Sequence, residues 1–462
     1  MKSLRPALAS LLSLALAGAL VVAAPVPAAQ ADTPSGWVPI GDPLPGTVND
    51  LIRYRGTLYA GGTFGLATWD EGAGAWTLLG SGSPRNIKKL VVGPDGTLYA
   101  GGQIRVGQQS VAFAAVWQDS GWKDLGTASG PLDPMGSELF SMAIDPQGRL
   151  VVGGLFRSFG GTEVGSLAMY DGKGWSALPG SLNVIVGVTA LAYGPDGTLY
   201  VGAFAVLNNM QSYAWSLRNG TWSPMAGSNF LDYSCPGYNP CMGVLDMIVD
   251  GKGTVHAAGQ MKIGSTLTGY ATWDGKSWSP QPASGMTVGA SLARDDQDGA
   301  MYAALGDQPG GARWMVARMG DPVIALGEPT SNAGTQALTV HAGVAYAAFA
   351  TGYIGDPAAR WQVASYTLPA KAKASAVPRN IRFIDSHRGK PTLAWKAPAF
   401  RKPGAYRVQY RVEASDPWTK VKVLEGRRQA RLPRSTAGQW VEVRVKARGA
   451  DWATVRLLAP AG

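Results

Sequence analysis

The chain has 462 residues, a formal net charge of +10, three histidines and two cysteines. So few histidines and cysteines, with no His-Glu-x-x-His motif and no paired Cys/His spacing, exclude the usual zinc centres. No segment after residue 31 is apolar over the ~20 residues that a membrane span needs, so we expect no transmembrane helix there.

Residues 1–31 have the pattern of a secretory signal peptide. Lys2 and Arg5 precede an apolar stretch from about Ala7 to Val22, and Ala29-Gln30-Ala31 follows as a cleavage site. The alternative, an N-terminal membrane anchor, would need a longer apolar run. The pattern predicts an exported protein, for which nucleic acid is not an expected partner.

One phrase, Gly96-Thr-Leu-Tyr-Ala-Gly-Gly102, recurs in seven copies that begin at residues 56, 96, 148, 197, 253, 299 and 343. A period of 40–56 residues is that of one four-stranded propeller blade per repeat. Seven copies predict an all-β fold in which residues 32–367 form a seven-bladed β-propeller.

Each repeat predicts four strands. An apolar run such as Ile87–Val92 ends at a Pro-Asp-Gly type turn, and the Gly-Thr-Leu-Tyr phrase follows as the second strand. Asp-Gly favours hairpins because glycine adopts positive φ without steric cost. Two further strands follow in most repeats, the last of them often marked by a tryptophan such as Trp76 or Trp122.

The two ends of the repeat array differ from the interior. Gly36–Gly41 reads as a fourth strand without a preceding repeat, whereas the last repeat ends at Tyr366 without such a strand. We therefore expect the N-terminal strand to complete the last blade, which leaves no open sheet edge at the seam.

Cys235 and Cys241 flank a segment rich in turn-forming residues. In an oxidising compartment we expect them to form a disulfide that closes a small loop. A loop this short mainly fixes local shape, because it removes little entropy from the unfolded chain.

The C-terminal part differs sharply in charge. Residues 370–462 carry a net charge of +15, whereas residues 32–369 carry −7. After a linker at 368–376, alternating apolar residues between 377 and 459 predict the strands of a small β-sandwich. The clustered Arg427, Arg428, Arg431 and Arg434 predict a surface for polyanions such as anionic cell-wall polymers or polysaccharides. Further basic residues alternate along the predicted strands, among them Lys420, Lys422, Arg444 and Lys446. The alternative is a solvated basic surface without a partner.

The repeats resemble those of secreted bacterial β-propeller proteins, and more distantly kelch and galactose-oxidase-type blades, with Gly153-Gly-Leu-Phe156 and Trp273-Asp-Gly-Lys-Ser-Trp278 as the clearest phrases. Residues 377–459 resemble a fibronectin type III domain in the strands around Trp395, Tyr406–Tyr410 and Val441–Ala447, although Trp440 replaces the usual corner tyrosine. In secreted bacterial proteins, such a domain implies a spacer or an accessory that binds surfaces.

Candidate catalytic residues are scarce. An oxidase of the galactose-oxidase type would need several converging histidines, and His256 and His341 lie in different repeats. No nucleophile elbow, dinucleotide motif or phosphate loop is present. Most acidic residues of the repeats lie in Gly-containing turns. The cluster Asp295-Asp296-Gln297-Asp298 leaves calcium as an alternative to no cofactor, but it lacks the full spacing of a calcium loop.

The sequence therefore predicts a secreted, non-catalytic binding or scaffold protein of the cell surface or extracellular space, with protein partners also open. A secreted glycoside hydrolase or lyase is the first alternative, and it would require a pair of carboxylates in one pocket. A sugar-binding lectin is the second alternative. The repeated tryptophans favour packing between blades over sugar stacking, because they recur at one repeat position.

Overall fold

The computed structural model describes residues 36–459 apart from several short segments. Those outside the description are 81–84, 119–120, 131–135, 181–185, 206–213, 228–242, 282–285, 308–312, 321–322, 332–334, 352–359, 369–378, 388–389, 397–405, 414, 425–427 and 448–451. The predicted disulfide between Cys235 and Cys241, and Arg427 of the predicted polyanion surface, lie outside the described residues. No helix in the described part is long and apolar enough to cross a membrane.

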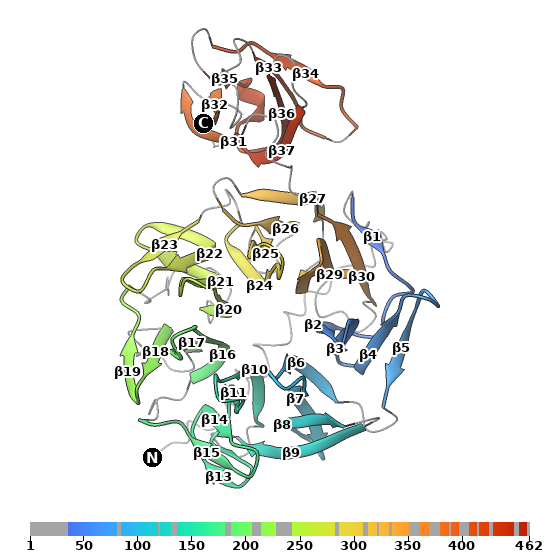
Figure 1. Cartoon of the computed structure of the whole chain (residues 1–462), viewed down its shortest axis with the longest axis vertical. Coiled ribbons are helices and arrows are strands. Elements are labelled where there is room, and N and C mark those ends of the chain that lie inside the picture. Colours follow the sequence, from blue (N-terminus) through green and yellow to red (C-terminus); the bar gives the residue numbers. More distant parts are fainter. Residues whose placement is uncertain are drawn as a thin grey trace, which may run out of the picture.

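The chain folds as a β-propeller, as the repeats predicted, with antiparallel sheets arranged around a centre (Figure 1). Between residues 38 and 367 the described residues form seven sheets. The first three sheets in chain order contain β2 (Val48–Tyr54), β3 (Thr57–Gly62), β4 (Gly65–Asp70) and β5 (Ala75–Leu79); β6 (Asn86–Val92), β7 (Leu98–Val106), β8 (Gln109–Gln118) and β9 (Gly121–Ser129); and β10 (Glu138–Ile144), β11 (Leu150–Leu155), β14 (Leu167–Tyr170) and β15 (Trp175–Ala177). A short hairpin of β12 (Ser158–Phe159) and β13 (Thr162–Glu163) extends the second of them at β9.

The next four sheets complete the ring. They contain β16 (Val186–Tyr193), β17 (Leu199–Ala205), β18 (Ala214–Arg218) and β19 (Thr221–Pro224); β20 (Val244–Val249), β21 (Val255–Ile263), β22 (Thr266–Trp273) and β23 (Trp278–Pro280); β24 (Val288–Arg294), β25 (Met301–Gly306), β26 (Arg313–Arg318) and β27 (Ile324–Ser331); and β28 (Thr335–His341), β29 (Val344–Thr351), β30 (Arg360–Thr367) and β1 (Val38–Pro39). In this last sheet β1 pairs antiparallel with β30, with Val38 opposite Ser365. The N-terminal segment is held further by Trp37, whose indole N–H donates to the carbonyl of Leu326.

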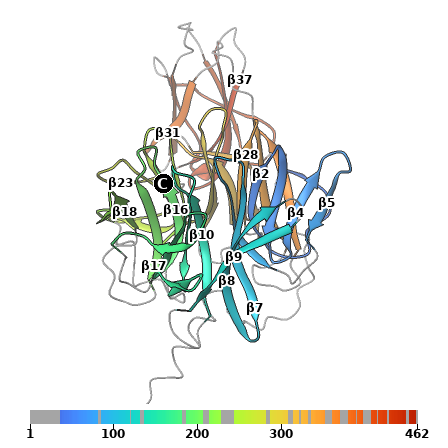
Figure 2. The same cartoon turned by 60° about the horizontal axis from the view of Figure 1, so that its bottom comes forward.

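The first strand of each repeat is the innermost one. These inner strands are β2, β6, β10, β16, β20, β24 and β28, and each contacts the next, with β28 returning to β2. Figure 2 shows several of them standing near the axis of the ring. Residues of the inner strands that lie beside one another in space are therefore up to 290 residues apart in the chain.

The two glycines of the repeated phrase have different steric roles. A Cβ on Gly101 would lie 2.5 Å from Sδ of Met142 on the inner strand of the next sheet. A Cβ on Gly102 would lie 1.9 Å from the backbone oxygen of Asn86 in its own sheet. The first glycine thus allows neighbouring sheets to pack closely, and the second lets the inner strand approach within the same sheet.

Beyond the ring, the described residues form two further antiparallel sheets. One contains β31 (Arg379–His387), β32 (Lys390–Lys396) and β35 (Gln429–Arg431). The other contains β34 (Thr419–Val421), β33 (Tyr406–Arg411), β36 (Trp440–Ala447) and β37 (Trp452–Leu458), and a 3-10 turn, η1, spans Arg434–Thr436. Leu393, Trp395 and Val443 belong to the shared core of the two sheets.

Described residues of the two-sheet unit contact the ring beside β27. Strand β37 lies beside β27 (Figure 1), and Trp440 is buried in a cluster with Met315 and Met319 of the ring. Trp440 is the residue that replaces the corner tyrosine of the resembled family, and here it packs between the two parts of the chain. Aromatic burial of this kind favours docking of the unit on the ring.

Candidate functional site

The inner strands share a local irregularity that places side chains toward the centre of the ring. In each strand the register with its neighbour shifts by one residue, which is the mark of a β-bulge. The residues directly after the bulge occupy equivalent positions in all seven sheets. They are Asp50, Lys89, Ser141, Ala190, Asp246, Ser291 and Ala337.

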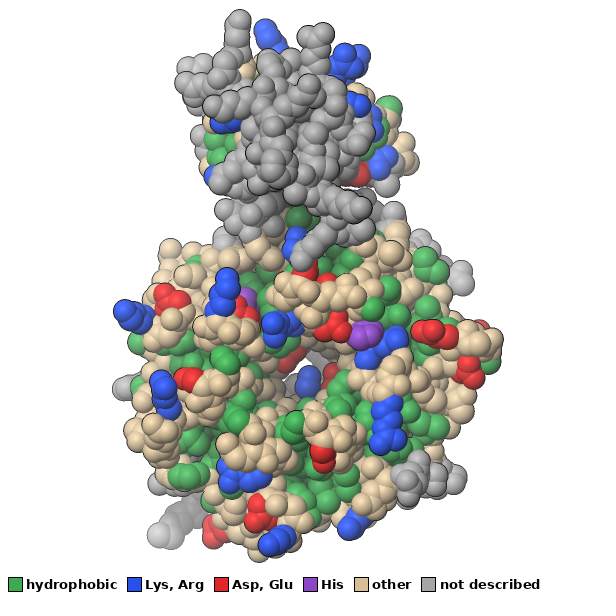
Figure 3. Space-filling view, in the orientation of Figure 1, with side chains coloured by type: hydrophobic (Ala, Val, Ile, Leu, Met, Phe, Trp, Pro, Cys, Tyr) green, Lys and Arg blue, Asp and Glu red, His purple; other side chains and the backbone are tan. Residues whose placement is uncertain are grey.

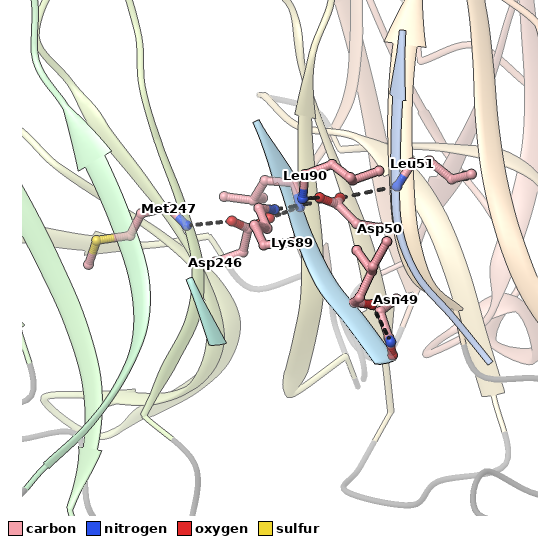
Figure 4. A network of polar contacts seen from close by, with 9 residues as sticks. Asn49, Asp50, Leu51, Lys89, Leu90, Asp246 and Met247 are labelled. Atoms are coloured by element: carbon pink, nitrogen blue, oxygen red, sulfur yellow. Dashed lines mark hydrogen bonds and ion pairs between the residues drawn. The ribbon is translucent and has the colours of Figure 1, made fainter. Parts of the chain in front are cut away.

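Three of these equivalent positions carry charge, and Figure 4 shows their side chains approaching one another from β2, β6 and β20. The space-filling view shows that the ring is hollowed at its centre, with charged side chains gathered around the hollow (Figure 3). We call Asp50, Lys89 and Asp246 the central triad.

Asp50 is buried, with 8% of its surface exposed. Its Oδ1 accepts a hydrogen bond from the backbone N–H of Leu51 at 3.1 Å, and its Oδ2 accepts one from Leu90 in the next sheet at 2.8 Å. The Nζ of Lys89 lies 3.6 Å from Oδ1. Burial raises the pKa of the Asp50 carboxyl, although the ammonium of Lys89 and the two backbone bonds act against that rise.

Asp246 repeats this geometry in a different part of the ring. Its Oδ1 accepts from the N–H of Met247 at 3.0 Å, and its Oδ2 accepts from Leu292 in the following sheet at 2.8 Å. In both cases the aspartate accepts from its own successor and from the corresponding residue of the next inner strand. Each aspartate therefore joins two neighbouring sheets.

Lys89 neutralises part of the charge of both aspartates. Burial favours its uncharged form, yet the negative charges of Asp50 and Asp246 outweigh this effect and raise the pKa of Lys89. The charge of Asp246 also raises the pKa of Asp50, so the three groups act on one another across the centre. All four carboxylate oxygens accept a backbone hydrogen bond, and this arrangement suits structural linkage better than proton transfer.

A second set of polar side chains comes from the N-terminal halves of the inner strands β2, β6 and β10 and from Gln103 of β7, which pairs with Asn86, and we call it the rim cluster. Asn49 donates through Nδ2 to Oδ1 of Asn86 at 2.9 Å, and Asn86 donates to Oε1 of Gln103 at 3.3 Å. Gln103 in turn is hydrogen-bonded to Glu138. Lys88 completes the set, because its charge interacts with that of Glu138.

The two charged members of the rim cluster are both partly desolvated. Burial raises the pKa of the Glu138 carboxyl, against the effects of Gln103 and Lys88. Burial also lowers the pKa of Lys88, against the charge of Glu138. The cluster combines amide donors and acceptors with one acid and one base, which is a set suited to hydroxyl or amide groups of a ligand.

The histidines of the repeats have local partners. The Nδ1 of His256 is hydrogen-bonded to the hydroxyl of Tyr270, and Nε2 lies 3.6 Å from Asp250. The Nδ1 of His341 lies 2.7 Å from Asp296. Burial lowers the pKa of His256, although Asp250 opposes the shift. The two histidines are thus each paired within or beside their own turn region.

The acidic cluster at residues 295–298 is engaged with three different neighbours. Asp295 accepts from the N–H of Gln297, Asp296 pairs with His341, and Asp298 pairs with Arg318. Within the described residues no group of three or more His, Cys, Asp or Glu side chains is placed to hold a metal ion. Calcium at this cluster stays a prediction that the sequence left open.

The structure places three of the four predicted polyanion-binding arginines along one stretch of chain. Arg428 lies directly before β35, Arg431 ends it, and Arg434 begins η1, and all three are exposed. Arg431 belongs to the three-stranded sheet, and Arg428 and Arg434 flank its strand β35. The basic residues of β33, β34 and β36 belong to the other sheet, so the tail carries two separate basic surfaces.

Comparison with known proteins assigns no family to this chain. No protein-family model matches the sequence, and no curated protein matches it. Among solved structures the chain is similar to virginiamycin B lyase from Staphylococcus aureus, with 9% identity over 69% of this chain and 95% of that one and a TM-score of 0.45. It is also similar to YCF48 from Cyanidioschyzon merolae, with 11% identity over 73% and 100% of the two chains and a TM-score of 0.46. PorZ of Porphyromonas gingivalis gives 14% identity, 89% and 59% coverage, and a TM-score of 0.38.

Sequence reasoning missed the central triad. The available signal was a charged residue inside an otherwise apolar first strand, as in Val48-Asn-Asp-Leu51 and Ile87-Lys-Lys-Leu90. The repeats hid it, because the equivalent positions in other sheets hold Ser or Ala. The fact that Asp246 and Lys89 meet follows from closure of the ring.

Proposed function

We propose that the chain is a secreted, non-catalytic binding or scaffold protein whose propeller presents a ligand site at one end of its centre. The observation that carries this proposal is the use of the central carboxylates. All four oxygens of Asp50 and Asp246 accept backbone hydrogen bonds, and Lys89 offsets their charge. Neither aspartate is thereby left as a free acid or base of the kind that glycoside hydrolysis requires.

The rim cluster is the ligand site of this proposal. Asn49, Asn86 and Gln103 offer both donors and acceptors. Asn49 comes from one sheet, and Asn86 and Gln103 are paired in the next. A hydroxyl-rich polysaccharide meets such a set with hydrogen bonds in both directions. Glu138 and Lys88 add one acidic and one basic group, which orient a ligand without giving the site a large net charge.

Export and the accessory role of the C-terminal part belong to the same proposal. The signal pattern of residues 1–31 and the expected disulfide between Cys235 and Cys241 support an extracellular location. The two packed antiparallel sheets of residues 379–459 support a fibronectin type III domain that serves as spacer or anchor. The kelch-like character of the blades rests on the repeat phrases alone.

One observation favours the enzymatic alternative. Burial raises the pKa of Glu138, and a raised carboxyl pKa is a property of general acids in polysaccharide hydrolases. We therefore test both functions on the same residue.

The test compares the mature protein with Glu138→Gln and Lys88→Gln in two assays. The first measures retention on immobilised polysaccharides, and the second measures reducing ends and unsaturated products released from soluble ones. We expect binding that the Gln variants weaken, with no product from any form. Product formation by the mature protein that Glu138→Gln abolishes would establish the enzyme and overturn the proposal.

A further inference from the structure

The four-stranded sheet of the C-terminal unit has one apolar and one charged face. Its strands pair in the order β34, β33, β36, β37, and Val408, Val443 and Val445 point into the core. Because successive residues of a strand alternate between faces, their neighbours lie on the outer face. We call this outer face the basic face, and its described charged residues are Arg407, Arg411, Lys420, Glu442, Arg444 and Lys446.

The pairing brings these charges next to one another. Arg407 lies opposite Lys446, Gln409 lies opposite Arg444, and Lys420 lies opposite Gln409 on the other side. In the whole chain, the side chains of Arg407 and Lys420 are exposed, and those of Arg444 and Lys446 are partly exposed. Among the described side chains of this face, five are cationic and one is a carboxylate, so together they carry a net charge of +4.

A tryptophan fixes two of the arginines. The guanidinium carbon of Arg444 lies 4.0 Å from the ring centroid of Trp418, and that of Arg411 lies 4.7 Å from it. The Nε of Arg444 also donates to Oε1 of Gln409 at 2.8 Å. Guanidinium groups held in this way lose little further side-chain entropy when they bind an anion.

Like charges at neighbouring positions of a sheet destabilise it unless a counter-charge is present. Glu442 supplies one, since it pairs with Arg411. Among the described side chains of this face, cations outnumber the one carboxylate, and a bound polyanion would add counter-charge. Cation spacing set by strand pairing suits a linear polymer that carries one charge per repeating unit.

We infer that the basic face binds a linear polysaccharide bearing carboxylates, an inference that rests on the proposed binding function and names its partner. Trp418 is a positioning residue, because arginine side chains lie against its ring. The face contains Lys420, Arg444 and Lys446, and it is distinct from the arginine cluster, because Arg428, Arg431 and Arg434 belong to the other sheet or its flanks.

The two basic surfaces allow a matched experiment. The probe is polygalacturonate immobilised on beads, with neutral dextran beads as the control ligand, and the protein is the whole mature chain in 0.15 M salt. The test variant is Arg444→Gln/Lys446→Gln, and the control variant is Arg431→Gln/Arg434→Gln, which removes the same charge from the other sheet. We expect the test variant to bind at least about tenfold more weakly, since a cation near an anionic surface contributes on the order of 1 kcal/mol. The control variant should change binding less than about twofold, because its charges lie outside the face.

Further variants distinguish loss of a direct contact with the polymer from loss of arginine positioning and from unfolding of the protein. Trp418→Ala should weaken binding and Trp418→Phe should restore most of it, because either aromatic ring supports a guanidinium. If Arg444→Gln/Lys446→Gln unfolds at a lower denaturant concentration than wild type, Arg407→Gln/Lys420→Gln replaces it, since both of these side chains are exposed. We expect this replacement variant to lose as much binding to polygalacturonate as the first double variant.

The inference is overturned if both double variants weaken binding equally, since net charge alone would then explain it. It is also overturned if polygalacturonate is not retained, or if Arg444→Gln/Lys446→Gln weakens retention on dextran beads as much as on polygalacturonate. Failure of the rim site is read from Glu138→Gln on neutral polysaccharides, and failure of the basic face is read from Arg444→Gln/Lys446→Gln on polygalacturonate.

Discussion

Replacement of Asp50 by asparagine tests whether the central triad holds the sheets together. The amide keeps the shape of the side chain, but it has one acceptor where the carboxylate has two. Asp50 accepts from Leu51 and from Leu90, so one of these N–H groups would face an amide NH₂. A lost hydrogen bond to a charged group costs about 1.5–3 kcal/mol.

The variant also leaves Lys89 without its nearest counter-charge. Breaking a buried ion pair costs about 3–5 kcal/mol, and the remaining charge of Asp246 together with the partial exposure of Lys89 reduces this. We therefore expect Asp50→Asn to lower the free energy of unfolding by about 3 kcal/mol in total. Denaturant unfolding followed by tryptophan fluorescence measures it.

Asp70→Asn is the matched control. The Oδ1 of Asp70 also accepts two backbone hydrogen bonds, from Gly72 and Ala73, but in an exposed turn. Its replacement should cost less than about 1 kcal/mol. The double variant Asp50→Asn/Lys89→Met should recover part of the loss, because it removes the unpaired ammonium. If Asp50→Asn is as stable as Asp70→Asn, the aspartate does not join the sheets and the argument for a structural triad is wrong.

Two further predictions concern the glycine pair and one tyrosine. Gly102→Ala should cost about 3 kcal/mol or more, because its Cβ would meet backbone. Gly101→Ala should cost less, about 1–2 kcal/mol, because its Cβ would meet only the side-chain ends of Met142 and Leu139. Equal losses in denaturant unfolding would refute the two roles. Burial and the charge of Asp145 raise the pKa of Tyr193 to about 12, with Arg149 acting against them. Folding therefore favours the protonated phenol, so its contribution is complete below pH 10 and is lost as the pH rises towards 12. Between pH 9 and 11.5 wild type should lose about 1–2 kcal/mol more than Tyr193→Phe, and parallel losses would show that this phenol does not titrate as described.

Much of the ring could be predicted because repetition makes strand order visible. The run Ile87–Val92 lies within β6, and the Leu-Tyr-Ala-Gly-Gly phrase begins β7, as the periodicity indicated. The turn residues predicted the connections between strands in the same way, since Oδ1 of Asp95 accepts a hydrogen bond from the N–H of Thr97 in the predicted turn. These features depend on residues close in sequence, and a single repeat contains all of them.

The central triad could not be predicted in the same way. A β-bulge decides which inner-strand residue faces the centre, and the residue at that position differs from repeat to repeat. Lys89 and Asp246 are 157 positions apart in the numbering, and they interact because the inner strands close into a ring. Local patterns carry no information about such an encounter.

In the basic tail, strand pairing decides which charges lie side by side. Arg428, Arg431 and Arg434 are close along the chain, and the prediction grouped them for that reason. Strand pairing instead brings Arg444 and Lys446 of β36 beside Gln409 and Arg407 of β33. Trp418 then becomes important only through its contacts with guanidinium groups, which no spacing rule indicates.

The charge asymmetry decides the conditions under which these surfaces can be told apart. After removal of residues 1–31 the two parts would carry −7 and +15. At about 0.01 M salt the Debye length of roughly 30 Å lets a polyanion sense both charges together, so any basic substitution weakens attraction. At 0.15 M the length falls to about 8 Å, and only cations near the polymer contribute. The difference in polyanion binding between the Arg444/Lys446 and Arg431/Arg434 variants should therefore be small at low salt and widen as salt approaches the physiological value. A local binding face behaves in this way, whereas net charge alone would produce the opposite trend.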